Sequence, residues 1–119
     1  MDDSIAHLTN DVIRFRDERD WAQFHRPKDL ALGLSIEAGE LCELFLWKTE
    51  TEIEGLRRNP AFLERVAEEI ADVQVFLLYL SHGLGIALPD AVRRKLELNA
   101  KKYPVEQSRG SARKYSDPK

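Results

Sequence analysis

Two pairs of carboxylates, each pair spaced three residues apart, are the side chains in this sequence best suited to chemistry. The first pair is Glu37 and Glu40, and the second is Glu69 and Asp72. Residues three apart share one face of an α-helix, where two like charges destabilise the helix by about 0.2–0.5 kcal/mol unless something compensates them. Buried carboxylates need a partner, and a divalent cation can neutralise several that converge. The spacing therefore predicts a metal site inside a small helical bundle, with these four residues as metal ligands and catalytic groups.

The surroundings of both pairs favour this interpretation over that of ordinary solvated helix carboxylates. At about 100° per residue, Glu37 falls in the middle of an apolar stripe, and Glu69 falls close to another. The stripe residues are Leu30, Leu34, Leu41 and Leu44 around Glu37, and Phe62, Phe76 and Leu80 around Glu69. Small residues beside the acids would allow two backbones to approach closely; they are Ala38, Gly39 and Ala71. Glu68 points away from the core, and we expect it in solvent as an internal control.

The ligand types indicate which metal to expect. Neither pair contains the histidine of the Glu-x-x-His motifs in di-iron bundles, and zinc favours nitrogen and sulfur ligands. An all-oxygen set suits Mg²⁺, with Mn²⁺ as a substitute. Because Mg²⁺ often completes its shell with substrate phosphates, the site indicates phosphoryl chemistry. The segment Gly83-Leu84-Gly85 lacks the lysine and the Ser/Thr of a P-loop, and Cys42 has no histidine near it in the sequence.

Composition indicates a globular protein of one domain. The chain has 119 residues, of which 43% are hydrophobic and 33% charged, which suits amphipathic helices. A net charge of −3 gives no reason to expect a nucleic acid polymer as partner. The single cysteine excludes an internal disulfide. The most apolar run, residues 73–80, is too short to span a bilayer, and the start lacks the pattern of a signal peptide. We therefore expect a soluble cytoplasmic protein without a membrane partner.

Hydrophobic periodicity and capping residues predict an all-α fold. We expect long helices over about residues 4–19, 27–47, 60–83 and 88–103, and a short extra helix between 49 and 58. Ser4, Thr49 and Asn59 are expected to cap helix starts, and Pro104 to stop the last long helix. The prediction is a four-helix bundle domain over residues 1–104, followed by a mobile polar tail over residues 105–119.

The helix expected over residues 60–83 is too apolar for a small bundle to cover. Between residues 73 and 80 only Gln74 is polar, so the helix is apolar nearly all round. Large exposed apolar patches are rare on soluble monomers, and closed homo-oligomers usually cover them. We therefore expect this helix at a subunit interface, with Leu78 on the side that is most exposed in an isolated chain.

Several further motifs, together with the acid pairs, resemble the all-α nucleoside triphosphate pyrophosphohydrolases, the MazG-like superfamily, and most closely its dCTP pyrophosphatase branch. The acids follow the pattern Glu-x-x-Glu and then Glu-x-x-Asp, with no departure at the four positions. The further motifs are Arg19-Asp20-Trp21 with Phe24-His25, Leu44-Phe45-Leu46-Trp47-Lys48, Lys95-Leu96-Glu97-Leu98-Asn99 leading into Lys102-Tyr103-Pro104, and Arg113-Lys114-Tyr115. The resemblance covers nearly the whole chain.

The resemblance implies hydrolysis of a nucleoside triphosphate between the α and β phosphates. The implied substrates are dCTP and modified dCTP analogues, and the implied role is house-cleaning of the nucleotide pool. The four acids would bind Mg²⁺, and Glu40 is a candidate to accept the proton of the attacking water. The implied substrate contacts are Trp21, His25 and Trp47 for the nucleobase, and Lys95, Asn99, Lys102 and Tyr103 for the phosphates and the sugar or base. The family is also implied to be a homotetramer with sites shared between subunits.

Other interpretations stay open at this point. The same chemistry could act on dUTP or other noncanonical nucleotides. The chain could instead be a non-catalytic helical oligomeric regulatory protein whose acids hold a structural ion. The tryptophans could be core or interface aromatics, His25 could be structural, and the lysines could belong to an ordinary solvated surface.

Overall fold

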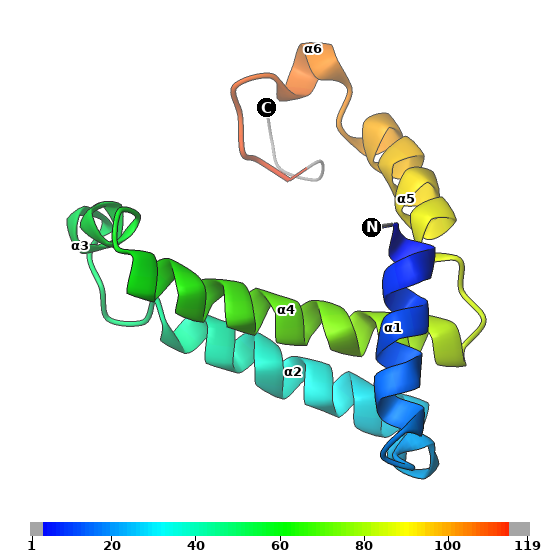
Figure 1. Ribbon diagram of the computed structural model, residues 1–119. Coiled ribbons are helices and arrows are strands. Elements are labelled where there is room, and N and C mark those ends of the chain that lie inside the picture. The colour runs from blue at the N-terminus through cyan, green and yellow to red at the C-terminus, as the bar shows by residue number, and fades with distance from the viewer. Residues whose placement is uncertain (1–3, 115–119) are drawn as a thin grey trace. The chain divides into compact units, whose positions relative to one another are not determined.

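The computed structural model describes residues 4–114, and every regular element in that range is helical (Figure 1). The elements are α1 (Ile5–Asp17), the short 3-10 helix η1 (Ala22–Phe24), α2 (Pro27–Glu43), α3 (Glu50–Leu56), α4 (Pro60–Gly83), α5 (Leu88–Lys102) and α6 (Val105–Ser108). The all-α class is thus confirmed, with four long helices and a short helix between the second and third. The tail contains the unexpected short helix α6, while residues 115–119, including Tyr115, lie outside the described residues.

Side-chain caps begin three of the helices as expected. The Ser4 hydroxyl accepts a hydrogen bond from the backbone N–H of His7 at 3.1 Å, and that of Thr49 accepts one from Glu52 at 3.1 Å. The Asn59 side chain accepts from two backbone N–H groups in the first turn of α4, at 3.0 and 3.3 Å. These bonds satisfy donors that the first turn of a helix leaves without partners.

Helix α2 is shorter than its sequence suggests. It ends at Glu43, and turns follow to Trp47, which has a left-handed backbone with φ of 62°. A left-handed residue cannot continue a right-handed helix, so the chain leaves the helix direction here. The expected end near Trp47 was therefore wrong by about one turn.

The chain forms two compact units that divide between Ile86 and Ala87. The first contains α1 to α4 and the second contains α5 and α6, and each is described by itself. The four acids expected to bind metal belong to the first unit, whereas the residues expected to contact phosphates lie on or beside α5 in the second. The division into a domain over residues 1–104 and a tail over residues 105–119 stays a prediction.

The core of the first unit lies where α4 packs along α2 and against α1 (Figure 1). Its buried side chains are Leu30, Leu44, Phe62, Leu78 and Tyr79. The Tyr79 hydroxyl donates a hydrogen bond to the Val12 carbonyl at 2.9 Å, which joins α4 to α1. Leu78 is only 2% exposed, so the expectation that it faces outwards was wrong. On a helix that is apolar nearly all round, periodicity does not identify which face meets the solvent.

A close approach between α2 and α4 occurs at Gly33. A Cβ atom on Gly33 would lie 2.5 Å from Cε1 of the Phe76 ring, closer than two carbon atoms can pack. Gly39, which we expected to permit close approach, has nothing within 4 Å of its Cβ position. The contact that brings the two helices together is therefore almost two turns earlier in α2 than the sequence suggested.

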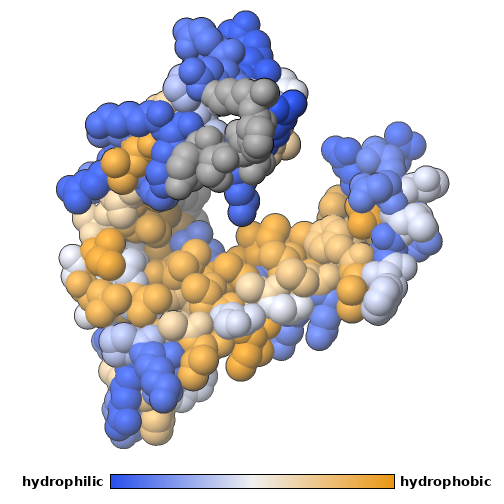
Figure 2. Space-filling view, turned by 180° about the vertical axis from the view of Figure 1, so that it is seen from behind, coloured by the Kyte–Doolittle hydropathy of each residue, from blue (hydrophilic) through white to orange (hydrophobic). Residues whose placement is uncertain are grey.

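Apolar side chains remain exposed on α2 and α4, the two longest helices of the first unit. Ile36 on α2 is 63% exposed and Ile70 on α4 is 53% exposed. Figure 2 shows hydrophobic side chains as a band along the α2 and α4 pair. Within residues 4–114, no single helix is long and apolar enough to cross a membrane, and α4 and α5 reach that length and composition only when counted together across their break.

The Gly33 contact leads to a stability prediction. Gly33→Ala should lower the free energy of unfolding by about 1–2 kcal/mol, because an overpacking cost of about 1–3 kcal/mol exceeds a helix-propensity gain of about 0.5–1 kcal/mol. Gly39→Ala is the matched control in the same helix, and it should raise the free energy of unfolding by about 0.5–1 kcal/mol. Urea unfolding of both variants measures the difference. Equal stabilisation by the two substitutions would contradict the close approach.

Candidate metal centre

Three of the four expected ligands meet between α2 and α4. Glu37, Glu40 and Glu69 each offer a carboxylate oxygen, and these oxygens all lie within 4.8 Å of one another. Glu37 and Glu40 lie one turn apart on α2, and Glu69 faces them from α4. Asp72 lies one turn after Glu69, is exposed, and falls outside this three-residue cluster. Three carboxylate oxygens are thus close enough together to bind one metal ion, and a fourth acid lies one turn away.

Two oxygens of this cluster are buried without a hydrogen-bond partner. They are Oε2 of Glu37 and Oε2 of Glu69. Within the described residues, no ion pair to a basic side chain involves any of the four acids. A buried carboxylate oxygen without a donor is costly, and a cation removes that cost by taking the oxygen as a ligand. The donor set therefore fits a hard divalent cation such as Mg²⁺, which prefers oxygen ligands.

The electrostatics of the cluster oppose full ionisation. Burial is the main cause that raises the pKa of Glu37, followed by a hydrogen bond with Glu40 and the charges of Glu40, Asp72 and Glu69. Burial also raises the pKa of Glu69, with the charges of Glu40 and Asp72 as the next causes. Asp72 therefore acts on both half-buried carboxyls even though it lies outside the trio. A bound cation would reverse these shifts, because its charge favours the ionised carboxylates.

Glu68 behaves as the control position should. It is exposed, and its charge is the last of the causes that raise the pKa of Glu69. Its position about 100° round the helix from Glu69 places it off the face that meets α2. The assignment of Glu69 to the inner face and of Glu68 to solvent agrees with the structure.

The three residues expected to bind the nucleobase do not come together within one chain. Trp21 and His25 precede α2, whereas Trp47 follows it. With 17 residues and a rise of 1.5 Å per residue, α2 is about 26 Å long. Trp47 is 92% exposed at the far end. One chain can therefore present either end to a nucleobase, and all three residues can line one pocket only if copies of the chain share it.

His25 lies in a partly buried position at the start of α2. Its ring is 4.5 Å from the Tyr79 ring, and its Nδ1 atom is buried without a hydrogen-bond partner. Burial and the nearby charge of Arg16 lower the pKa of His25, so the ring is neutral at pH 7. A neutral imidazole has one N–H donor and one acceptor nitrogen, so the ring can donate one hydrogen bond. This state agrees with a donor role towards a ligand, which stays a prediction.

The residues expected to contact phosphate belong to the second unit. Lys95 and Asn99 are four residues apart on α5 and so share one of its faces. Lys102 is the last residue of α5, and Tyr103 follows it with its backbone N–H bonded to the Asn99 carbonyl at 2.8 Å. Their expected contacts with a substrate stay predictions.

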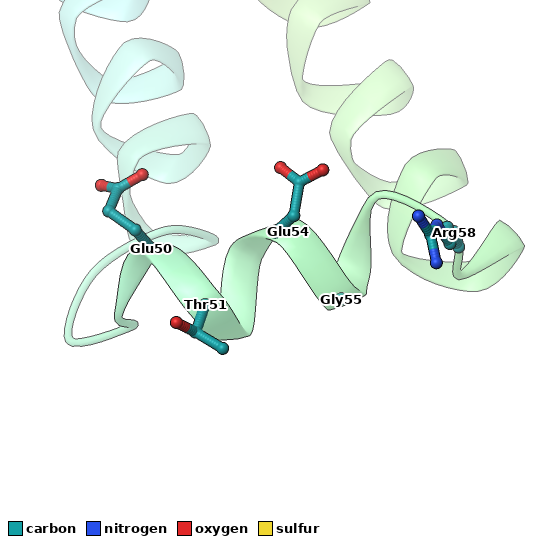
Figure 3. A pocket seen from close by; sticks show the side chains of 5 residues that line it. All are labelled: Glu50, Thr51, Glu54, Gly55 and Arg58. Atoms are coloured by element: carbon teal, nitrogen blue, oxygen red, sulfur yellow. The ribbon is translucent and has the colours of Figure 1, made fainter.

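A separate surface hollow lies beside α3 and contains no expected site residue. It is lined by Glu50, Thr51, Glu54, Gly55 and Arg58 (Figure 3). Glu50 and Glu54 extend from one side of α3, and Thr51 extends from the other (Figure 3). Glu54 already accepts a hydrogen bond from Arg57 at 3.1 Å. The charge of Glu54 is therefore compensated, unlike that of the acids between α2 and α4.

The raised pKa values predict how pH and Mg²⁺ change the stability of the fold. An ordinary glutamate pKa is about 4.3, so between that value and the raised native one the folded chain binds more protons than the unfolded chain. The stability contributed by these protons is present below about pH 4.3 and is lost as the pH rises through the raised pKa. Without metal at pH 7, the double variant Glu37→Gln/Glu69→Gln should therefore be more stable than the wild-type chain, and the difference should shrink towards pH 5. Thermal unfolding across this range measures it.

Added Mg²⁺ should reverse that order. A ligand at 100 times its dissociation constant stabilises the native state by about 2.7 kcal/mol, and only the wild-type chain should gain this. Glu68→Gln should follow the wild-type chain in both conditions. A double variant that Mg²⁺ stabilises as much as wild type would rule out Glu37 and Glu69 as ligands.

Comparisons with known proteins agree with the resemblance of the motifs. A sequence model of the MazG-like family matches residues 32–117. The protein dCTP pyrophosphatase 1 of Mus musculus is 46% identical over 103 residues, which make up 87% of this chain and 61% of the mouse protein. Its Homo sapiens counterpart is 42% identical over 103 residues. A crystal structure of a pyrophosphatase from Archaeoglobus fulgidus matches with a TM-score of 0.76 and 42% identity, over 84% of this chain and 92% of that chain.

The extent of these matches decides what they establish. The chain spans about three fifths of the length of the curated relatives. The family match, in contrast, covers most of this chain and includes all four acids. The chain therefore belongs to the MazG-like family.

Proposed function

We propose that this chain is a Mg²⁺-dependent nucleoside triphosphate pyrophosphohydrolase that converts dCTP, and modified dCTP analogues, to the monophosphate and pyrophosphate. The observation that carries this proposal is the cluster of Glu37, Glu40 and Glu69, with two buried oxygens that lack partners. The relatives named dCTP pyrophosphatase 1 support the choice of substrate. The proposed setting is the nucleotide pool of the cytoplasm.

The side chains would divide the reaction between them. Glu37, Glu40, Glu69 and Asp72 would hold Mg²⁺ through carboxylate oxygens. When bound, Mg²⁺ supplies positive charge to the phosphate oxygens and lowers the pKa of a bound water. Glu40 is exposed at the edge of the cluster, where it can accept the proton of the attacking water.

The remaining proposed contacts bind the rest of the nucleotide. Lys95 and Lys102 would neutralise phosphate charge. Asn99 and Tyr103 would form hydrogen bonds with the phosphates, the sugar or the base. The nucleobase would lie between aromatic side chains from the two ends of α2. Because those ends are about 26 Å apart, the pocket would combine Trp21 and His25 of one copy with Trp47 of another.

A homotetramer is the proposed assembly. The exposed apolar side chains on α2 and α4 support it, as does Trp47, whose large indole has no cover within its own chain. An assembly would bury these faces and complete the pocket at once.

Product analysis tests the chemistry. Incubation with dCTP and Mg²⁺ should release dCMP and pyrophosphate, because the acids would place the attacking water at the α phosphorus. Glu37→Gln and Asp72→Asn should abolish turnover with the fold intact, and Glu68→Gln should leave it within about twofold, because an exposed side chain off the site contributes little. Ion chromatography of the products, with dUTP and a modified dCTP in parallel, measures both points.

Other products would identify the competing functions. Primary release of dCDP and inorganic phosphate would exclude this mechanism. Preferred turnover of dUTP would change the substrate but keep the chemistry. No turnover of any nucleotide, together with Mg²⁺ binding, would favour a regulatory protein with a structural ion.

The assembly is tested separately. Ile70→Glu should dissociate the oligomer, because it places a charge on an exposed apolar position of α4 where a second copy would pack. Glu64→Lys, at an exposed polar position of the same helix, is the control and should leave the assembly intact. Light scattering at micromolar concentration measures the mass. A wild-type chain that is monomeric at 13.7 kDa and fully active would overturn both the tetramer and the shared pocket.

A further inference from the structure

A cluster of one guanidinium and two aromatic rings lies at the end of α1. Cζ of Arg19 lies 3.6 Å from the centroid of the Phe15 ring, and Nη1 donates a hydrogen bond to the Phe15 carbonyl at 2.9 Å. The Phe15 and Trp21 rings meet edge to face, with centroids 5.9 Å apart and planes at 69°. Arg19 therefore contacts both the ring and the backbone of the residue against which Trp21 rests.

The backbone between these residues is shaped to return Trp21 to α1. Asp20 has a left-handed conformation with φ of 54°, which is uncommon for a residue other than glycine. The backbone N–H of Trp21 then bonds to the Arg16 carbonyl at 3.1 Å. This turn reverses the chain just after the helix, and it places the indole beside the Phe15 ring at the surface.

Both aromatic rings lie at the surface, outside the buried core. Phe15 is 48% exposed and Trp21 is 44% exposed, so neither is locked by a surrounding core. The turn lies beyond the last residue of α1, where helix ends fray and local stability is low. The guanidinium of Arg19 stacks on the Phe15 ring and bonds to the Phe15 carbonyl. It therefore joins the turn after α1 to the ring that supports Trp21.

The contacts of Arg19 differ from those of Arg57 and Arg93, two other exposed arginines. Arg57 and Arg93 are paired with carboxylates one turn away, at 3.1 and 3.3 Å. For Arg19 the carboxylate of Glu18 is 3.9 Å away, a weak contact, and the strong ones are to the aromatic ring and the carbonyl. A planar guanidinium can stack and donate in its plane at the same time, which a lysine ammonium cannot do.

We propose that Arg19 is a positioning residue for the nucleobase: it holds the Phe15 ring and the turn that leads to Trp21, so that the free side of the indole is ordered before a base binds. The proposal rests on the proposed function, in which Trp21 contacts the base. An ordered platform loses less conformational entropy on binding, which increases affinity without a new contact to the ligand. Because Arg19 would support the substrate and the transition state equally, its loss should raise KM and leave kcat nearly unchanged.

The order of Trp21 can be measured without any nucleotide. In a Trp47→Phe background Trp21 is the only tryptophan, since the sequence contains two. Arg19→Met and Arg19→Lys should both increase acrylamide quenching of Trp21 and lower its fluorescence anisotropy. Arg57→Met, which removes an exposed arginine directly after α3, should change neither. Far-UV circular dichroism checks that each variant is folded. If Arg19→Met does not fold, the conservative variant Arg19→Lys still provides the test.

Affinity and turnover are then measured with both tryptophans present. Arg19→Met and Arg19→Lys should raise KM for dCTP by about 3- to 5-fold, the loss of a cation–π contact, with kcat within about twofold. Phe15→Leu should have a similar effect, and the double variant Phe15→Leu/Arg19→Met should be no worse than either single one, because both act through one contact. Arg57→Met should leave both constants unchanged.

The outcomes separate this proposal from the proposed function. Unchanged Trp21 quenching in the Arg19 variants, or a lower kcat with an unchanged KM, would overturn the role of Arg19. So would increased Trp21 mobility without any change in dCTP affinity. A wild-type chain that hydrolyses no nucleotide but binds dCTP with an Arg19-dependent affinity would overturn the hydrolysis and support Arg19.

Discussion

The packing of α2 along α4 is the contact on which both the core and the candidate site depend. Gly33 lets the Phe76 ring approach the backbone of α2, and the buried residues Leu30, Leu44 and Phe62 lie along the same pair of helices. Glu37 and Glu69 lie on the faces that this packing joins, so the contact that excludes water from the leucines also excludes it from one oxygen of each carboxylate. The packing of α2 on α4 therefore produces both the apolar core and the electrostatic cost of burying two carboxylate oxygens. Glu40 and Asp72 stay exposed, where solvent screens their charges, and this limits the cost to two oxygens.

The parts of the fold that the sequence predicted are those with local causes. Ser4, Thr49 and Asn59 cap the helices they were expected to cap, because a capping side chain bonds to backbone only two or three residues away. The four acids were located from their spacing, since residues three apart must share a helix face. Features that depend on a partner in space were not predictable in this way. Gly33 and Gly39 are both helical glycines, and only the Phe76 ring on another helix distinguishes them.

Leu78 and Trp47 show two further limits of local reasoning. The stretch around Leu78 is apolar on every side, so its periodicity could not tell the inner face from the outer one. The left-handed backbone of Trp47 has no signature in residue type, because left-handed residues are usually glycine, asparagine or aspartate. For the candidate site, the four acids could be named in advance, but the separation of Trp21 from Trp47 required the length of the helix between them.

Strain and exposure coincide at the two ends of α2. Within residues 4–114, the only non-glycine residues with positive φ are Asp20, next to Trp21, and Trp47 itself. Such conformations cost free energy and persist where the surrounding structure or a function maintains them. Here they hold two large aromatic side chains on the surface, one against Phe15 and Arg19 and the other almost fully in solvent. The middle of the same helix carries Glu37 and Glu40, whose mutual repulsion also opposes stability. Selection for stability alone would replace the acids with apolar residues and the left-handed residues with glycine. These three costly features lie before, within and after α2, and they agree with the proposal that each binds part of one ligand in an assembly of several copies.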